Sequence, residues 1–126
     1  MATNKGITVR FQSDEWLPKS GDYSDYKLHY SFVNSDLLGK PEEESQTKNG
    51  YIIIRISGTL SAIWGFADED LRKILFEYGK RHISKLISEG APIDCVGLQL
   101  NSYNFPEKCP FDPNQIDLNF DKPINF

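Results

Sequence analysis

Apolar and polar residues alternate along four stretches of this chain, and each is predicted to be a β-strand with one buried face. The stretches are residues 6–12, 26–33, 51–57 and 94–101. The third, YIIIRIS, gives the strongest signal, because Ile53 adds an apolar side chain on the second face. This pattern predicts a central strand that is covered on both faces for part of its length. Arg55 shares the face of Ile53, so its charge needs a partner or a position at the sheet's edge.

Residues 68–89 follow the period of an α-helix, with apolar side chains on two separate stripes. One stripe contains Leu71, Ile74, Leu75, Tyr78, His82 and Leu86, and the other contains Phe76, Ile83 and Ile87. A helix that lies on one sheet needs a single stripe, so a second surface should cover this helix. That surface is either the chain's own C-terminal tail or a second subunit of a homodimer. Phe76, Gly79, Ile83 and Ile87 are accordingly candidate interface residues, and Gly79 allows a close approach.

The stretch GTLSAIWGFADEDL joins the strongest strand to the long helix. Ser57 can cap a short helical segment that Gly65 ends in a left-handed conformation. Asp68 can cap the long helix, and Asp68 and the two acids after it suit the first turn, where the helix dipole favours negative charge. The stretch is therefore predicted to be a strand-to-helix corner. The alternative is an exposed recognition corner formed by Trp64 and Phe66.

Two segments are predicted to be irregular. Residues 34–50 combine Gly and Pro with consecutive glutamates and are predicted to be a mobile loop ending in a tight turn at Asn49 and Gly50. Residues 102–126 contain four prolines and form a predicted extended arm with a short edge strand near 116–120. The whole of residues 1–126 is expected to be a single α+β domain. Its antiparallel-rich sheet of four to five strands carries the long helix, about 68–89, on one face.

Composition narrows the classes of function. The net charge is −4, which argues against nucleic-acid binding and suits a basic protein partner. No apolar run is long enough to span a bilayer, and the N-terminus lacks the apolar core of a secretory signal. We therefore expect a protein with no membrane association that acts in the cytoplasm of a bacterium or of an infected host cell. Cys95 and Cys109 are expected to be reduced thiols there, with a disulfide only in an oxidising compartment.

Catalytic and metal-binding signals are weak. The chain contains no phosphate-binding loop, no nucleophile-elbow motif and no zinc-protease motif. His29 is expected at the surface, and His82 is expected to be a partly buried structural residue. A nucleophile–base pair of Cys95 and His82 is conceivable but has no supporting third group. The sequence therefore predicts a protein that is not an enzyme and that carries no metal and no cofactor.

The aromatic residues carry the strongest binding signal. Trp16, Tyr23, Tyr26 and Trp64 are flanked by acids, and aromatic side chains ringed by carboxylates suit an interface with a basic protein. The predicted binding residues are Trp16, Tyr23, Tyr26, Arg55, Trp64 and Phe66. Packing of the same aromatics at the sheet ends is an equal alternative. A second hypothesis places Arg55, Tyr30 and Trp64 around a pocket for a small ligand.

The pieces ITVRF, Trp16, RISGTL and DLRKILFEYGKRHISKLI resemble the pattern of a family of small bacterial α+β proteins of unknown function. The resemblance supports the fold and implies no activity. For function we expect a non-enzymatic, acidic binding protein that acts by occluding a partner, such as an immunity protein or a phage-encoded inhibitor of a defence system. The alternatives are a small-ligand-binding domain and a virion or assembly component.

Overall fold

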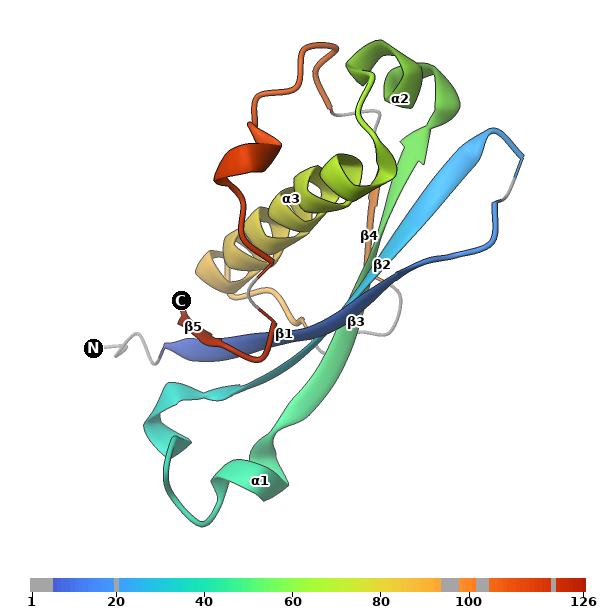
Figure 1. Cartoon of the computed structure of the whole chain (residues 1–126). Coiled ribbons are helices and arrows are strands. Elements are labelled where there is room, and N and C mark those ends of the chain that lie inside the picture. Colours follow the sequence, from blue (N-terminus) through green and yellow to red (C-terminus); the bar gives the residue numbers. More distant parts are fainter. Residues whose placement is uncertain (1–5, 20, 94–97, 102–104, 119) are drawn as a thin grey trace.

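A computed structural model describes residues 6–19, 21–93, 98–101, 105–118 and 120–126. Five strands form one mixed sheet in the order β4-β3-β2-β1-β5, and one long helix lies across a single face of it (Figure 1). The strands are β1 (Ile7–Trp16), β2 (Tyr23–Asn34), β3 (Lys48–Ser57), β4 (Leu98–Asn101) and β5 (Pro123–Asn125), and the helices are α1 (Glu43–Gln46), α2 (Gly58–Trp64) and α3 (Asp68–Ser88). The predicted α+β class is confirmed.

The sheet is antiparallel except at one pair of strands. The pairing is antiparallel between β1 and β2, between β1 and β5 and between β2 and β3, whereas β4 runs parallel to β3. The alternation of the strands places Val9, Phe11, Leu28, Tyr30 and the even-numbered isoleucines of β3 in the core under α3. Of the predicted strand 94–101, residues 98–101 form β4, and residues 94–97 lie outside the described residues.

Gly79 is the point at which α3 lies closest to the sheet. An added Cβ there would meet Ile54 Cδ1 at 3.1 Å and Leu28 Cδ2 at 3.2 Å. The arc between the two apolar stripes therefore faces the sheet, and the stripes flank that contact. Phe76, Gly79 and Ile83 are buried within the single chain, so the expectation that they contact a second subunit is wrong for these three. Ile87 is half-buried at the far end of the helix.

The C-terminal segment covers the outer side of α3, which confirms the tail as the second surface. Phe120 contacts Phe76 edge to face at 5.8 Å, and Phe111 contacts Tyr78 at 4.9 Å between ring centroids. Figure 1 shows this segment crossing the front of the helix before it returns to the sheet. A 3₁₀ turn spans Pro113–Gln115. The edge strand predicted near 116–120 is instead β5, where Pro123 is tolerated because it occupies a sheet edge.

The corner between β3 and α3 largely matches its prediction. Ser57 caps α2 by accepting a hydrogen bond from the Leu60 N–H at 3.1 Å, and Gly65 ends α2 with a φ of 68°. The predicted cap at Asp68 is wrong, because Ala67 occupies the cap position of α3 and Asp68 is the first residue of the helix. Asp68, with the two acids that follow, lies in the first turn as predicted.

The predicted loop 34–50 is shorter and more ordered than its composition suggests. It contains a 3₁₀ turn at Ser35–Leu37 and the short helix α1, and residues 48–50 already belong to β3. The tight turn predicted at Asn49 and Gly50 is therefore wrong. Gly50 pairs with Tyr30 across the strands, and an added Cβ would lie 2.8 Å from the Tyr30 ring. The glycine is needed for that close contact.

Candidate binding surface

Four elements, β1, β2, α2 and α3, meet at the end of the sheet that carries the strand-to-helix corner. Trp16, the last residue of β1, pairs with Tyr26 of β2. The N–H of Gly58, at the start of α2, donates to the Asp22 carbonyl at 2.7 Å. The first turns of α3 lie over the same region (Figure 1). We call this region the acidic end and define it by Asp14, Glu15, Trp16, Asp22, Ile63, Asp68 and Glu69.

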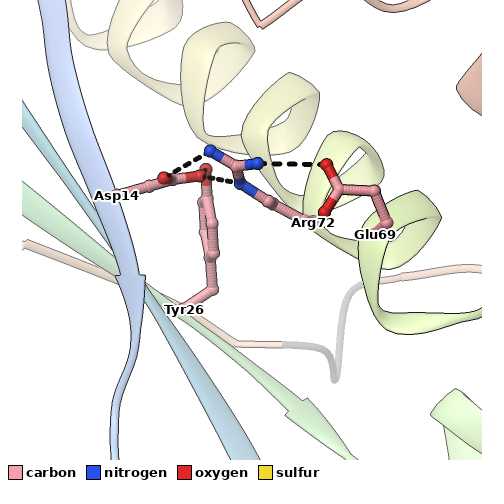
Figure 2. Close-up of polar contacts among 4 residues, drawn as sticks. All are labelled: Asp14, Tyr26, Glu69 and Arg72. Atoms are coloured by element: carbon pink, nitrogen blue, oxygen red, sulfur yellow. Dashed lines mark hydrogen bonds and ion pairs between the residues drawn. The ribbon is translucent and has the colours of Figure 1, made fainter.

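A network of charged hydrogen bonds ties β1 to α3 at the acidic end. Figure 2 shows Asp14 of β1 and Arg72 of α3 facing each other above Tyr26. The Arg72 guanidinium donates through Nε to Asp14 Oδ2 at 2.6 Å and through Nη2 to Oδ1 at 2.8 Å. The Tyr26 hydroxyl donates to the same Oδ2 at 2.6 Å. Arg72 Nη1 reaches Glu69 Oε1 at 3.0 Å.

The network positions its side chains and has no group poised to react. The Asp14 side chain is only 7% exposed, and its charge is compensated by the two-point contact with Arg72. Burial, and then the bond to Asp14, raise the pKa of Tyr26 well above its usual range. The bond to Asp14 also raises the pKa of Arg72. Tyr26 therefore stays protonated and Arg72 stays charged at neutral pH, so neither can transfer a proton there.

Two large apolar side chains reach solvent at the acidic end. Ile63 of α2 is 54% exposed and Trp16 is 36% exposed, and they are the exposed large hydrophobic residues among those that the structure describes. The Trp16 ring packs edge to face on Tyr26 at 5.5 Å, so Tyr26 supports it from inside the core. An exposed, supported tryptophan is typical of the residues that anchor protein interfaces.

The six predicted binding residues do not form one surface. Tyr26 is fully buried, so the expectation that its ring is exposed is wrong. Tyr23 and Arg55 lie together on the sheet face opposite α3, where Arg55 stacks on the Tyr23 ring and forms a two-point ion pair with Asp25 at 2.8 and 2.9 Å. This pair provides the partner that the sequence required for Arg55.

Trp64 and Phe66 pack against the C-terminal segment. The Trp64 ring stacks on Tyr78 at 6.2 Å and on Phe105 at 6.0 Å, and its Nε1–H donates to the Pro106 carbonyl at 3.2 Å. Phe66 contacts the edge of Trp64 at 6.3 Å. Both rings are half-buried, so they serve more to fix the C-terminal segment than to present a recognition corner.

The small-ligand pocket predicted around Arg55, Tyr30 and Trp64 is wrong. Tyr30 is fully buried on the helix side of the sheet, where its hydroxyl donates to the Ile93 carbonyl at 2.7 Å. Arg55 lies on the opposite face of the sheet, and Trp64 lies on α2. The sheet itself therefore separates the groups that the pocket requires.

Sequence reasoning missed the residues that hold the acidic end together, namely Asp14 and Arg72, and it missed Ile63 as an exposed residue. Arg72 carried a usable signal, because it falls on the arc of α3 between the two apolar stripes. A charge on a buried arc requires a buried counter-charge. Ile63 carried no such signal, because its exposure depends on where α2 lies on the folded chain.

Two hollows lie away from the acidic end. One, of about 750 Å³, lies where the end of α3 meets the sheet, and its lining includes Ile7, Phe32, Lys48, Ile87, Ile93 and Phe126. The other, of about 790 Å³, is more polar and includes Thr8, Arg10, Ser31, Lys40 and Glu43. Among the described residues, no group of three or more His, Cys, Asp or Glu side chains could hold a metal ion.

The two histidines lie on different elements, His29 on β2 and His82 on α3. His29 contacts Glu15 at 3.1 Å on the surface of the sheet, as expected for a surface residue. His82 is half-buried on α3, and burial and the nearby Lys85 lower its pKa. Cys95 lies outside the described residues, so its pairing with His82 stays a hypothesis. Cys109 is a free, half-buried thiol whose pKa is raised by burial.

No helix in the described part of the chain is both long and apolar enough to cross a bilayer. Comparison with known proteins gives no relative: no protein-family model matches the chain, and no curated protein or solved structure is significantly similar to it. The family resemblance seen in the sequence therefore stays a prediction.

Proposed function

We propose that this chain is a non-enzymatic binding protein that uses its acidic end to contact a basic partner protein and occlude part of its surface. The observation that carries the proposal is the position of Trp16 and Ile63. Trp16 directly follows the acids Asp14 and Glu15 on β1, and Ile63 lies on α2, the short helix that precedes the acidic first turn of α3.

The chemistry of the acidic end supports a protein partner. Apolar anchors supply most of the binding energy of a typical interface, and surrounding charges select the partner and speed its approach. Glu69 is 68% exposed and Glu15 is 55% exposed, so both carboxylates can meet cations of a partner. An overall charge of −4 adds a long-range attraction for a basic protein.

A role in binding, without catalysis, agrees with the chemistry of the Asp14 network at the acidic end. The side chains of the Asp14 network are paired with one another, and the raised pKa values of Tyr26 and Arg72 hold these two in one protonation state at neutral pH. Small acidic proteins of this kind include immunity proteins and phage-encoded inhibitors of defence systems, and such a role would be exercised in the cytoplasm of a bacterium or of an infected cell. The analogy rests on size and charge alone.

The test is capture of a partner from an extract of the cells in which the protein occurs, using the wild-type chain and two variants. Ile63→Glu places a charge on an apolar anchor, whereas Gln46→Glu adds the same charge on exposed α1, at the opposite end of the molecule (Figure 1). We expect both wild type and Gln46→Glu to retain one stoichiometric basic protein, and Ile63→Glu to lose it by at least about tenfold in affinity. Equal retention by all three would exclude the acidic end as the binding surface.

A second candidate function, small-ligand binding, is favoured by the hollow of about 750 Å³ at the far end of α3. Its volume falls in the range of small-molecule sites, and its lining combines apolar side chains such as Phe32 and Ile87 with Lys48 as a charged group. A ligand there would leave the acidic end free, so the two candidate functions predict different sensitivities to Ile63→Glu.

A further inference from the structure

The outer edge of β1 is closed by β5 along only half its length. β5 pairs with Thr8–Arg10, Ile7 exchanges two backbone hydrogen bonds with Phe126, and the Asp121 N–H donates to the Phe11 carbonyl at 2.8 Å. Beyond that point β1 continues to Trp16 with β2 as its described neighbour. Figure 1 shows this second half of β1 extending past β5 toward the acidic end.

The open half presents backbone groups that can accept another strand. The Leu17 N–H donates to the Asp25 carbonyl of β2 at 2.9 Å. In an antiparallel ladder alternate residues bond the same neighbour, so Ser13 and Glu15 also face β2, and the N–H and C=O groups of Asp14 and Trp16 face outward. Among the described residues no backbone group bonds those of Asp14 or Trp16 on that side.

The β-bulge of β1 separates the two halves. The register of β1 against β2 shifts between Phe11 and Ser13, which adds one residue to β1 at that point. Such a bulge bends and twists the strand. The open half of the edge is therefore turned away from the line of β5, and the described part of the C-terminal segment runs over α3 instead of continuing along β1 (Figure 1).

Exposed side chains flank the open edge on both of its faces. Trp16 stands on the face that carries α3, where its ring packs on Tyr26. Glu15 stands on the opposite face, where it contacts His29. A strand laid beside Ser13–Trp16 would therefore meet an apolar ring on one face and a carboxylate on the other.

We propose that the edge Ser13–Trp16 binds an extended, basic segment of a partner protein by β-strand addition, so that the segment becomes a new strand beside β1. The proposal deepens the proposed function and rests on it. The backbone groups of Asp14 and Trp16 supply the pairing. An apolar residue of the segment covers Trp16, and a Lys or Arg residue reaches Glu15.

Charge selects a basic partner over a second copy of this chain. Two-fold pairing of this edge with itself would bring Glu15 of one copy close to Glu15 of the other, and like charges opposite each other destabilise a strand pair. Bulges and charges at an edge are also the devices by which proteins prevent self-association of exposed strands. A segment rich in Lys and Arg converts the same charges into attraction.

The experiment selects displayed random peptides on the full-length protein and then measures amide hydrogen exchange with the most enriched peptide. We expect enriched peptides that alternate Lys or Arg with β-branched residues. The bound peptide should slow exchange at the Asp14 and Trp16 amides by at least about tenfold, while the Ser13 and Glu15 amides are already protected in the free protein. The matched control is the same peptide with alternate backbone nitrogens methylated along one edge, which keeps every charge and removes the donors; it should not bind.

Three outcomes overturn strand addition. They are the absence of enriched peptides, equal binding of the methylated peptide, and slowed exchange elsewhere with unchanged Asp14 and Trp16 amides. If any of these occurs while Ile63→Glu still abolishes capture of the partner, the proposed function stands and only the mode of binding is wrong. If Ile63→Glu has no effect and peptide binding also fails at the edge, both proposals fail.

Discussion

Helix α3 is attached to the rest of the chain by two junctions of opposite chemistry. At its start, Arg72 reaches Asp14 of the sheet through two short charged hydrogen bonds. Farther along, Tyr78 stacks on Phe105 of the C-terminal segment at 4.0 Å with an angle of 16° between the rings. The strength of the first junction depends on the geometry and the pairing of its hydrogen bonds, whereas the strength of the second depends on the contact area between its rings.

The two tyrosines of these junctions show the difference most directly. The Tyr26 hydroxyl donates to Asp14, whereas the Tyr78 hydroxyl is buried with no partner among the described residues. A polar junction loses much of its stabilising free energy when one member is removed, because the remaining members are left buried and unpaired. Stacked rings lose contact in proportion to what is removed. The polar junction should therefore be the more fragile of the two.

The largest effect is expected from Asp14→Ala. The substitution leaves the Arg72 charge and the Tyr26 hydroxyl without their acceptor, and we expect a loss of about 2–3 kcal/mol, a figure that allows for the partial exposure of Arg72. Thermal unfolding should shift downward by roughly 6–12 °C. Calorimetry measures both quantities.

A triple variant is the control for that loss. Replacing Asp14 by Leu, Arg72 by Met and Tyr26 by Phe removes the whole network, so no buried polar group is left unpaired. Most of the stability lost in Asp14→Ala should return. If the single variant costs less than about 1 kcal/mol, or the triple variant is the least stable of the set, the polar junction does not behave as an interdependent network.

The elements of this fold were predictable because their signals are local. Alternation located β1, β2 and β3, the Ser57 cap and Gly65 set the bounds of α2, and a second apolar stripe on α3 required a second covering surface. Each of these depends on residues close together in the chain. The prediction at Asn49 and Gly50 failed because a local turn signal competed with a distant contact, the packing of the Tyr30 ring on Gly50.

The candidate site was less predictable because its contacts join distant residues. Asp14 and Arg72 are 58 positions apart, and nothing in the sequence says which acid faces the one arginine on the inner arc of α3. Gly79 was identified as a point of close approach, but only the folded chain shows that the sheet is what approaches it. The open half of β1 depends on where β5 ends, and β5 itself was expected a few residues earlier.

A smaller effect is expected when the aromatic junction is shortened by Phe105→Ala. The ring is half-buried and contacts Trp64 and Tyr78, so its loss should cost about 1–2 kcal/mol. Trp16→Phe leaves Trp64 as the remaining tryptophan of the chain. When Phe105→Ala is added in this background, the fluorescence emission of Trp64 should shift to longer wavelength, while far-ultraviolet circular dichroism stays unchanged. Glu107→Ala, an exposed change in the same segment, should alter neither signal. Unchanged Trp64 emission in Phe105→Ala would mean that the ring does not shield Trp64.

The smallest effect is expected from Tyr78→Phe, and it gives the sharpest comparison when it is paired with Tyr26→Phe. Both variants delete one hydroxyl. Deleting the Tyr78 hydroxyl should stabilise the protein by less than about 1 kcal/mol at neutral pH, because a buried polar group without a partner is removed. Deleting the Tyr26 hydroxyl should destabilise the protein, because Asp14 loses a donor.

The pH dependence of stability tests the burial of the Tyr78 hydroxyl. Burial, with a smaller effect of Cys109, raises the pKa of Tyr78 to about 12 from its usual 10. Above pH 10 the unfolded chain therefore loses this proton before the folded chain does, so the contribution is intact below pH 10 and is lost as the pH rises toward 12. Tyr78→Phe should reduce the alkaline loss of stability, as measured by denaturant unfolding between those values. If the slope is unchanged, Tyr78 is not shielded from water, and the aromatic junction is looser than the stacked rings indicate.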